Sequence, residues 1–248
     1  MDALGWLAKN ASGEPQEVVK ATTATRAWFA RIDDRESFAK WYPEGLRDTW
    51  AHVEAAISGG GLHPAIVPLR RRVDLADGAL LVYDRVAGES LDPQATRARF
   101  ARLPPSERVD AVITVSEALA AVVKAGFMVV DWYEGNMIYD FEARRMWLFD
   151  WELCRAGGGF TLEMDANYGS SKLMAPEESV RGSRLDGLTV VFNLGRYALL
   201  TLPELAEPLA PVLARATYPA RAGRYATVGE YVEALRGGLP KPEPGLVG

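Results

Sequence analysis

The chain carries the stretch Asp131-Trp132-Tyr133-Glu134-Gly135-Asn136, and a second stretch follows at Leu148-Phe149-Asp150-Trp151-Glu152. Asp131 is a carboxylate that can orient a hydroxyl group and accept its proton. Asn136 and Asp150 offer an amide oxygen and a carboxylate, which are the hard oxygen ligands that Mg²⁺ prefers. These two stretches therefore predict a site at which a hydroxyl group and a metal ion are handled together.

The residues around these stretches predict how the three side chains meet. An apolar run at 127–130 leads into Asp131, and two short β-forming runs at 137–139 and 146–149 flank a turn. A hairpin of this kind brings the start of its first strand next to the end of its second. We therefore expect Asn136 and Asp150 to lie at neighbouring strand ends.

Composition excludes several classes of protein. The 248 residues are 48% hydrophobic and carry a formal net charge of −5, whereas nucleic-acid-binding domains usually present a basic face. The single cysteine, Cys154, excludes an internal disulfide framework and favours a reducing, cytoplasmic compartment. No apolar run reaches the length of a membrane span. We expect a globular protein that binds neither nucleic acid nor a membrane.

Periodicity divides the chain into two regions. The region before Gly88 is rich in β-forming residues, and the region after it shows apolar positions at helical spacing. The expected strands lie within 16–32, where a Thr-rich turn joins two of them, and at 65–69 and 79–83. The expected helices lie at 45–58, 106–124, 187–200, 203–216 and 226–236, followed by a frayed tail from 240 to 244.

The spacing of Asp131, Asn136 and Asp150 resembles the catalytic and metal-binding loops of the protein kinase superfamily, H-R-D-x-x-x-x-N followed by D-F-G. Further landmarks of that family occur in the expected order along residues 10–237. They are Glu54 at the position of the helix-C glutamate, Leu62–Val67 resembling H-P-N-I-V, a hinge-like segment at 82–91, Met174–Glu177 resembling A-P-E, and Arg224 as the late arginine that pairs with the A-P-E glutamate.

The resemblance implies an α+β, bilobal protein-kinase-like fold with a small antiparallel-sheet N-lobe and a mainly helical C-lobe. The N-lobe is expected at 1–86 and the C-lobe at 87–248, together forming one kinase-like domain. The implied activity is that of a bacterial-type serine/threonine protein kinase, which transfers phosphate from ATP to a hydroxyl of a protein substrate. ATP and Mg²⁺ are the implied cofactors, and Mn²⁺ could replace Mg²⁺.

The resemblance also implies a role for particular residues of this chain. Asp131 takes the catalytic position. The metal positions are Asn136, Asp150 and Glu152. The nucleotide-binding positions are Gly13, Val18, Arg31, Glu54, Asp84, Val86 and Ile138. The activation segment and its anchor are represented by Ser170, Glu177 and Arg224.

The sequence departs from the family pattern around the nucleotide. The glycine-rich loop is expected at 11–18, where Gly13 alone remains of three glycines. Arg31 is the best candidate for the strand-three lysine, with Ile32 or a one-residue shift as alternatives. If Arg31 is correct, Phe29 replaces the small alanine beside adenine.

A second set of departures lies under the catalytic loop. The family's histidine and arginine before the catalytic aspartate are Val129 and Val130 here, and the helix-F aspartate that supports them is Val190. Buried polar groups that are replaced together by apolar side chains need not destabilise a fold. We therefore expect a rebuilt apolar scaffold beneath Asp131.

Two alternative functions remain open. Residues 149–152 resemble the I-D-W-E metal loop of aminoglycoside and choline phosphotransferases, which favours a small-molecule acceptor. Glu177 and Arg224 favour the protein kinase branch, because aminoglycoside and choline phosphotransferases generally lack both features. The absence of the strand-three lysine would also fit a pseudokinase that binds nucleotide or a partner without turnover. The sequence indicates neither the oligomeric state nor the identity of the substrate.

Overall fold

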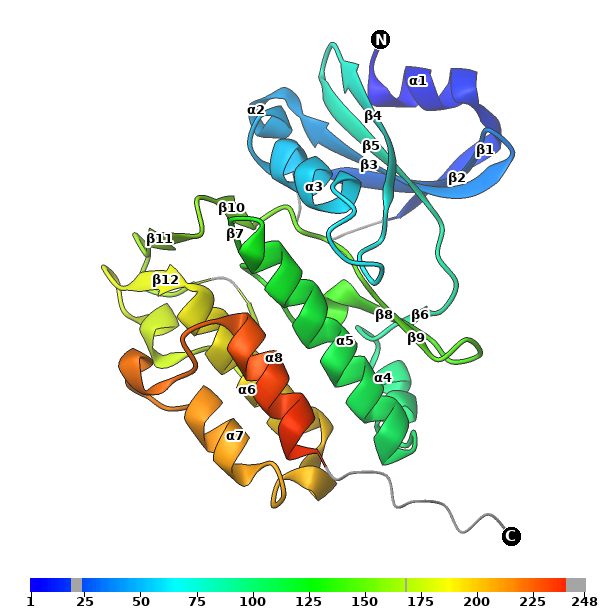
Figure 1. The fold of residues 1–248 in the computed structure, drawn as a ribbon. Coiled ribbons are helices and arrows are strands. Elements are labelled where there is room, and N and C mark those ends of the chain that lie inside the picture. Colours follow the sequence, from blue (N-terminus) through cyan, green and yellow to red (C-terminus); the bar gives the residue numbers. More distant parts are fainter. Residues whose placement is uncertain (19–23, 168, 240–248) are drawn as a thin grey trace, which may run out of the picture.

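The computed structural model of the chain describes residues 1–18, 24–167 and 169–239. A sheet forms one part of the molecule and a group of helices forms the other, with short strands between them (Figure 1). Part of the expected Thr-rich turn and the tail at 240–244 lie outside the described residues. None of the helices in the described ranges is long and apolar enough to cross a membrane.

The sheet has five antiparallel strands in the order β1-β2-β3-β5-β4. Their bounds are β1 Ala11–Val18, β2 Arg26–Ile32, β3 Arg35–Pro43, β4 Leu69–Leu75 and β5 Gly78–Asp84. Strand β5 reads Gly-Ala-Leu-Leu-Val-Tyr-Asp, and its first six residues are buried. This apolar run is typical of a strand covered on both faces.

Helices cover both faces of the sheet. Helix α1 (Ala3–Asn10) begins at Asp2, whose side chain accepts a hydrogen bond from the N–H of Gly5 at 2.7 Å, as a helix N-cap does. Trp6 and Leu7 of α1 pack on the outer face of the sheet. The short α2 (Glu44–Arg47) and α3 (Trp50–Gly59) lie on the side nearer the helical part (Figure 1).

The chain passes from the sheet to the helical part through residues 85–88 and strand β6 (Glu89–Ser90). Gly88 has a φ of +117°, and a Cβ atom at this position would lie 2.7 Å from the carbonyl oxygen of Tyr139. Glycine is therefore required here by both the backbone conformation and the close approach of another strand.

The helical part is built around the long helix α5, whose buried face belongs to the largest hydrophobic core. Asp186 and Thr227 accept hydrogen bonds from nearby backbone N–H groups and so cap α6 and α8. The bounds are α4 Gln94–Ala101, α5 Pro105–Lys124, α6 Gly187–Thr201, α7 Ala210–Ala216 and α8 Val228–Gly238, with 3₁₀ turns at Pro203–Leu205 and Arg221–Gly223.

Short strands and 3₁₀ turns carry the loops between the two parts. Strands β6, β8 and β9 form one small sheet, and β7 pairs with β10 and β11 with β12. The bounds are β7 Phe127–Met128, β8 Met137–Asp140, β9 Arg145–Leu148, β10 Arg155–Ala156, β11 Gly159–Thr161 and β12 Arg184–Asp186, with 3₁₀ turns η1 Glu134–Asn136 and η2 Pro176–Ser179.

The structure confirms the bilobal α+β class and corrects several elements. The run at 65–69 is not a sheet strand, because Ile66 bridges to Leu148 in the other part and β4 begins only at Leu69. The helix expected at 203–216 is broken into a 3₁₀ turn and α7. Helix α1, strand β3 and helix α4 were not expected from the sequence.

Candidate functional site

The Asp131 loop is held in a conformation that few non-glycine residues adopt. Asp131 has a φ of +53°, in the left-handed region where side chains other than glycine are disfavoured. The amide nitrogen of Asn136 donates to the carbonyl oxygen of Asp131 at 3.1 Å and to that of Asp150 at 3.2 Å. Asn136 thus ties the two loops together, as the hairpin at 137–149 predicted.

The Asp150 loop is also held in a left-handed conformation, with a φ of +68° at Asp150. Both residues that flank Asp150 are held through their backbone N–H groups. The N–H of Phe149 donates to the carbonyl of Asn136 at 3.1 Å, and the N–H of Trp151 donates to the carboxylate of Glu54 at 2.7 Å. Strained backbone that its surroundings hold in place is frequent at functional sites.

A lysine that the sequence analysis did not select lies at the centre of the site. The ammonium of Lys40, on β3, lies 2.5 Å from Oδ1 of Asp150 and 2.7 Å from Oε2 of Glu152. Burial acts to lower the pKa of Lys40, but the charges of Asp150, Glu54 and Glu152 outweigh it and raise the pKa. Lys40 is therefore charged at neutral pH.

The expectation that Arg31 takes the place of the strand-three lysine is wrong. Arg31 lies on β2, its side chain is 51% exposed, and it pairs with Asp34 and Glu36 at the surface. It does not line the cavity that contains Lys40. Its exposure follows from strand alternation, because neighbouring residues Ala30 and Ile32 point into the core beneath α1.

The glycine-rich loop expected at 11–18 is likewise misplaced, because these residues form strand β1. Gly13 has a φ of +86° within an irregular stretch of the β1–β2 pairing, between Ser12 and Gln16. A left-handed glycine is the usual residue of such a bulge. Gly13 lies toward the end of β1 that is remote from the β1–β2 turn, and it does not line the cavity, whereas Val18 does.

One cavity of about 390 Å³ joins most of the expected site residues. It lies between the inner face of the sheet and the loops around Asn136 and Asp150. Expected residues in its lining are Val18, Glu54, Asp84, Val86, Asn136, Ile138 and Asp150. Residues that were not expected there as site residues include Phe29, Phe38, Lys40, Tyr83 and Tyr133.

Part of the cavity lining is aromatic and apolar. The rings of Phe29 and Phe38 lie 5.6 Å apart, and those of Phe38 and Tyr83 lie 6.3 Å apart. Phe38 precedes Lys40 by two residues and faces the same side of β3. Ile138 lines the cavity from β8. These surfaces suit a flat heteroaromatic ring.

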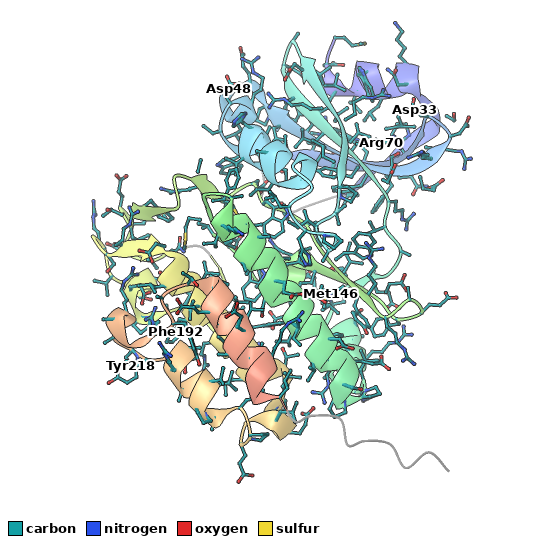
Figure 2. All side chains as sticks on the ribbon, viewed as in Figure 1. Asp33, Asp48, Arg70, Met146, Phe192 and Tyr218 are labelled. Atoms are coloured by element: carbon teal, nitrogen blue, oxygen red, sulfur yellow. The ribbon has the colours of Figure 1, made fainter. Side chains whose placement is uncertain are left out.

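The last residue of β5 and the two residues that follow it border the cavity. Asp84, Arg85 and Val86 all line the cavity. The N–H of Arg85 is used in a hydrogen bond of 2.9 Å to the carbonyl of Glu36. The side chain of Asp84 is held by Arg70 at 2.6 Å, and Arg70 also lies 3.9 Å from Asp33, close to which Figure 2 shows it. The backbone at 84–86 is thereby fixed beside the cavity.

Glu54 does not form the ion pair with the strand-three cation that the resemblance implies. Its two oxygens accept hydrogen bonds from the hydroxyl of Tyr83 at 2.9 Å and from the N–H of Trp151 at 2.7 Å. Burial raises the pKa of Glu54; Lys40 opposes this rise, and the charge of Asp150 adds to it. Glu54 therefore anchors the backbone of the Asp150 loop to α3.

The scaffold beneath Asp131 is apolar, as the sequence predicted. Val129, Val130 and Val190 are at most 5% exposed and belong to the same hydrophobic core. A ring of Trp132 packs edge-on against Tyr197 with centroids 5.2 Å apart. Packing of this kind holds the loop from below without a buried charge.

The segment from Gly169 to Glu177 returns to the Asp131 loop and is then anchored in the helical part. Gly169 has a φ of +127°, and a side chain there would begin 3.6 Å from the Cα atom of Asp131. Ser170 follows directly. The two guanidinium nitrogens of Arg224 lie 2.6 and 2.8 Å from the two carboxylate oxygens of Glu177. The predicted Glu177–Arg224 pair is thus confirmed as a buried, bidentate ion pair.

The surroundings of Arg224 explain its burial. Its guanidinium also donates to the carbonyl groups of Tyr218, Leu188 and Pro219 and lies 4.8 Å from the ring centre of Phe192. Figure 2 shows Phe192 and Tyr218 in the same region of the helical part. A buried arginine whose donors are all satisfied is stable only while its carboxylate partner is present.

The donor chemistry of the site fits Mg²⁺ bound together with a phosphate ligand. Because the nitrogen of Asn136 is used for two backbone carbonyls, its amide oxygen is left as a ligand beside Asp150. Among the described residues no three His, Cys, Asp or Glu side chains converge as a metal cage. Mg²⁺ commonly takes one or two protein ligands and completes its shell with water and phosphate oxygens.

Comparison with solved structures finds protein kinase domains. The kinase domain of Mycobacterium tuberculosis PknI is 18% identical, and the match covers 90% of this chain and 94% of that one with a TM-score of 0.64. The Cydia pomonella Granulovirus kinase PK-1 is 15% identical, with coverages of 93% and 96% and a TM-score of 0.70. No protein-family profile and no curated protein matches the sequence. The chain therefore has the fold of protein kinase domains.

Proposed function

We propose that this chain transfers the terminal phosphate of ATP to a serine or threonine hydroxyl of a protein substrate. The observation that carries the proposal is the convergence of Lys40, Asn136 and Asp150 on one cavity, beside the Asp131 loop. The aromatic part of the cavity lining suits adenine, and the polar part suits phosphates. The sheet region to Val86 and the helical region that follows would act as the two lobes around the nucleotide.

Each polar side chain has a distinct role in this proposal. The Lys40 ammonium would steady the phosphates of the ADP leaving group, and Asn136 and Asp150 would hold Mg²⁺, which would neutralise charge on the phosphates. Asp131 orients the acceptor hydroxyl and takes its proton as the oxygen bonds to phosphorus and the bond to ADP breaks. Glu54 keeps the Asp150 loop in place.

The buried Glu177–Arg224 pair supports a protein acceptor over a small molecule. It fastens the segment after Gly169 to the helical part, and this segment is the feature that aminoglycoside and choline phosphotransferases generally lack. The solved structures with this fold are also described as kinase domains.

The buried Cys154 fits a reducing compartment, for which we propose the cytoplasm.

The Lys40→Met variant is expected to lower kcat/KM for phosphate transfer about 10²–10³-fold, since it removes a fixed charge that stabilises developing phosphate charge. Arg31→Ala should leave the rate unchanged, because Arg31 is exposed and outside the cavity. The measurement is transfer of labelled phosphate from ATP to a Ser/Thr peptide library, with aminoglycosides and choline as parallel acceptors. Lys40→Arg keeps the charge and reveals any loss caused by misfolding.

The opposite ranking of Lys40→Met and Arg31→Ala would show that Arg31 is the phosphate ligand after all. Transfer to a small molecule alone would establish the alternative substrate class. Transfer to no acceptor, despite nucleotide binding, would identify a pseudokinase.

The melting temperature should rise by about 5–10 °C when ADP and Mg²⁺ are present at about a hundred times their dissociation constant. Asp150→Asn should abolish the part of this rise that depends on Mg²⁺, because it removes the proposed carboxylate ligand. Asp150→Asn also weakens the ion pair with Lys40 and so changes the melting temperature of the ligand-free protein. The shift is therefore measured for each variant relative to the same variant without ligand. Asp165→Asn, an exposed aspartate, is the control. An unaltered Mg²⁺-dependent shift in Asp150→Asn would remove Asp150 from the metal site.

A further inference from the structure

The ammonium of Lys40 is held between two carboxylates of the metal-binding loop. Asp150 lies 2.5 Å away and Glu152 lies 2.7 Å away, and the side chain of Lys40 is 4% exposed. At such low exposure water hardly screens the charges, and a lysine that lost its carboxylate partners would be strongly disfavoured. The arrangement therefore raises the question of which carboxylate keeps Lys40 in place when a ligand occupies the cavity.

Of the two carboxylates that pair with Lys40, one lines the cavity and the other does not. Lys40 and Asp150 line the cavity, whereas Glu152 does not. The side chain of Glu152 is 12% exposed, and the ring centre of the fully buried Tyr42 lies 5.1 Å from the Lys40 ammonium. A ligand in the cavity can thus engage Asp150 without displacing Glu152.

Glu54 forms no ion pair with Lys40 in this structure. Its oxygens are occupied by the Tyr83 hydroxyl and the Trp151 N–H. Among the ion pairs of the described residues, Lys40 pairs with Asp150 and Glu152 and makes none with Glu54. The carboxylate that remains in contact with Lys40, once Asp150 turns to another ligand, is Glu152.

We infer that Glu152 is a positioning residue, which holds the Lys40 ammonium and fixes it toward the phosphates of a bound nucleotide. This inference replaces the expectation from the sequence that Glu152 is a metal ligand. Its kinetic consequence rests on the proposed phosphotransfer, but the contact itself does not. With Glu152 in place, Asp150 can leave Lys40 for Mg²⁺ without stranding a buried charge.

The contact is tested first without nucleotide or metal, by a double-mutant cycle in EDTA. The change in melting temperature on Glu152→Gln is measured in the native chain and in Lys40→Met. In the native chain Glu152→Gln removes an ion pair with Lys40, whereas in Lys40→Met it relieves repulsion among Glu54, Asp150 and Glu152. We therefore expect the change in melting temperature to be less favourable in the native chain by about 3 °C or more. Equal changes in both backgrounds would overturn the inference.

The control for this cycle is Glu36→Gln, which makes the same chemical change on the same strand as Lys40. Glu36 is 59% exposed and pairs with Arg31 at the surface. Its substitution should alter the melting temperature equally whether residue 40 is lysine or methionine.

A second measurement separates positioning from metal binding. The Mg²⁺ concentration that gives half of the ADP-dependent thermal shift is measured for Glu152→Gln in both backgrounds. A direct metal ligand would raise this concentration by roughly tenfold or more in each. A residue that acts through Lys40 should leave it unchanged in Lys40→Met, and a rise in that background would overturn the inference.

The kinetic measurement compares the effect of Glu152→Gln on kcat with its effect on KM for ATP. In the native background Glu152→Gln should lower kcat roughly ten- to a hundredfold through misplacement of Lys40, with a much smaller change in KM for ATP. An unchanged kcat in an active enzyme would contradict the inference. Should the chain transfer no phosphate at all, the proposed function fails while the stability cycle and the Mg²⁺ titration still decide the role of Glu152.

Discussion

Replacing Asp131 with asparagine is expected to lower the rate of phosphate transfer about 10²–10⁴-fold, the range that a positioned general base commonly contributes. Asparagine keeps the size of the side chain and its hydrogen-bonding ability but cannot accept the proton of the acceptor hydroxyl. Asparagine is also among the residues that best tolerate the left-handed conformation, and Asp131 has a φ of +53°. The loop should therefore keep its shape.

Binding of ADP should be unaffected by this substitution, because Asp131 is not among the residues that line the nucleotide-sized cavity. The measurements are single-turnover transfer from labelled ATP and calorimetric titration with ADP and Mg²⁺. Asp165→Asn serves as the control for a loss of one negative charge. A variant with normal transfer would show that another group takes the proton. A variant that loses both transfer and binding would show that Asp131 supports the fold of the site.

These outcomes bear directly on whether the chain is an enzyme. The main sequence argument for a pseudokinase was the missing strand-three lysine. Lys40 lies buried on β3 in contact with Asp150, so this argument no longer holds. What distinguishes the site is the carboxylate Glu152 paired with Lys40, at the position where the D-F-G pattern has glycine.

The sequence was sufficient to predict that the loops of Asp131, Asn136 and Asp150 lie together. Asp131, Asn136 and Asp150 are separated by short segments whose strands and turns have strong local signals, so the hairpin at 137–149 could be placed correctly. The apolar replacements Val129, Val130 and Val190 were also predicted to pack together, because an apolar side chain requires only burial and not a particular partner.

The lysine of the site could not be placed, because the hairpin of β2 and β3 was missed. Strands β2 and β3 are joined by the two-residue turn Asp33–Asp34, in which both residues have positive φ values of 52° and 60°. Such turns are usually signalled by Asn-Gly or Asp-Gly, and two aspartates give a much weaker signal. Because this turn was not recognised, residues 35–43 were not predicted to form a strand. Arg31 was then the last basic residue on a predicted strand before the helix at 45–58, and Lys40 was not considered.

A signal for Lys40 was nevertheless present. Residues 37–42 read Ser-Phe-Ala-Lys-Trp-Tyr, a β-forming run that places Phe38, Lys40 and Tyr42 on one face. Lysine is almost never fully buried unless it is paired, so a lysine on a strand face that it shares with two aromatic residues is a candidate for a paired, functional cation. Helix α1 was not expected, and Gly13 lies in a bulge of β1 and not in the β1–β2 turn, so the glycine-rich loop was also misplaced.

Breaking the Glu177–Arg224 pair should have the largest effect on stability. The Arg224 side chain is 0% exposed and that of Glu177 is 7% exposed, so neither charge can turn to water if the other is removed. We expect Glu177→Gln to lower the free energy of unfolding by about 3–5 kcal/mol, the usual cost of stranding one buried charge. Replacing both residues, as Glu177→Gln with Arg224→Met, should cost less than the sum of the single changes.

The matched control is Glu117→Gln, which breaks an ion pair of 2.5 Å with Arg236 between α5 and α8. Both of those side chains are partly exposed, so the expected loss is roughly 0–1 kcal/mol. Urea unfolding of the four variants provides the comparison. Equal losses for Glu177→Gln and Glu117→Gln would mean that the buried pair adds no more to stability than a surface one.

The pH dependence of the same pair has a definite sign. Burial acts to raise the pKa of Glu177, but the hydrogen bonds from Arg224 and the charge of that residue outweigh it, so the folded-state pKa lies below the ordinary glutamate value of 4.5. A lowered carboxylate pKa stabilises the fold fully above the unfolded-state value, and this stabilisation is lost as pH falls through the folded-state value. The difference in melting temperature between the native chain and Glu177→Gln should therefore be constant near neutral pH and should shrink below about pH 4.5, as Glu177 itself becomes protonated. A difference that stays constant down to pH 3 would show that the charge of Glu177 is not what holds Arg224 in the fold.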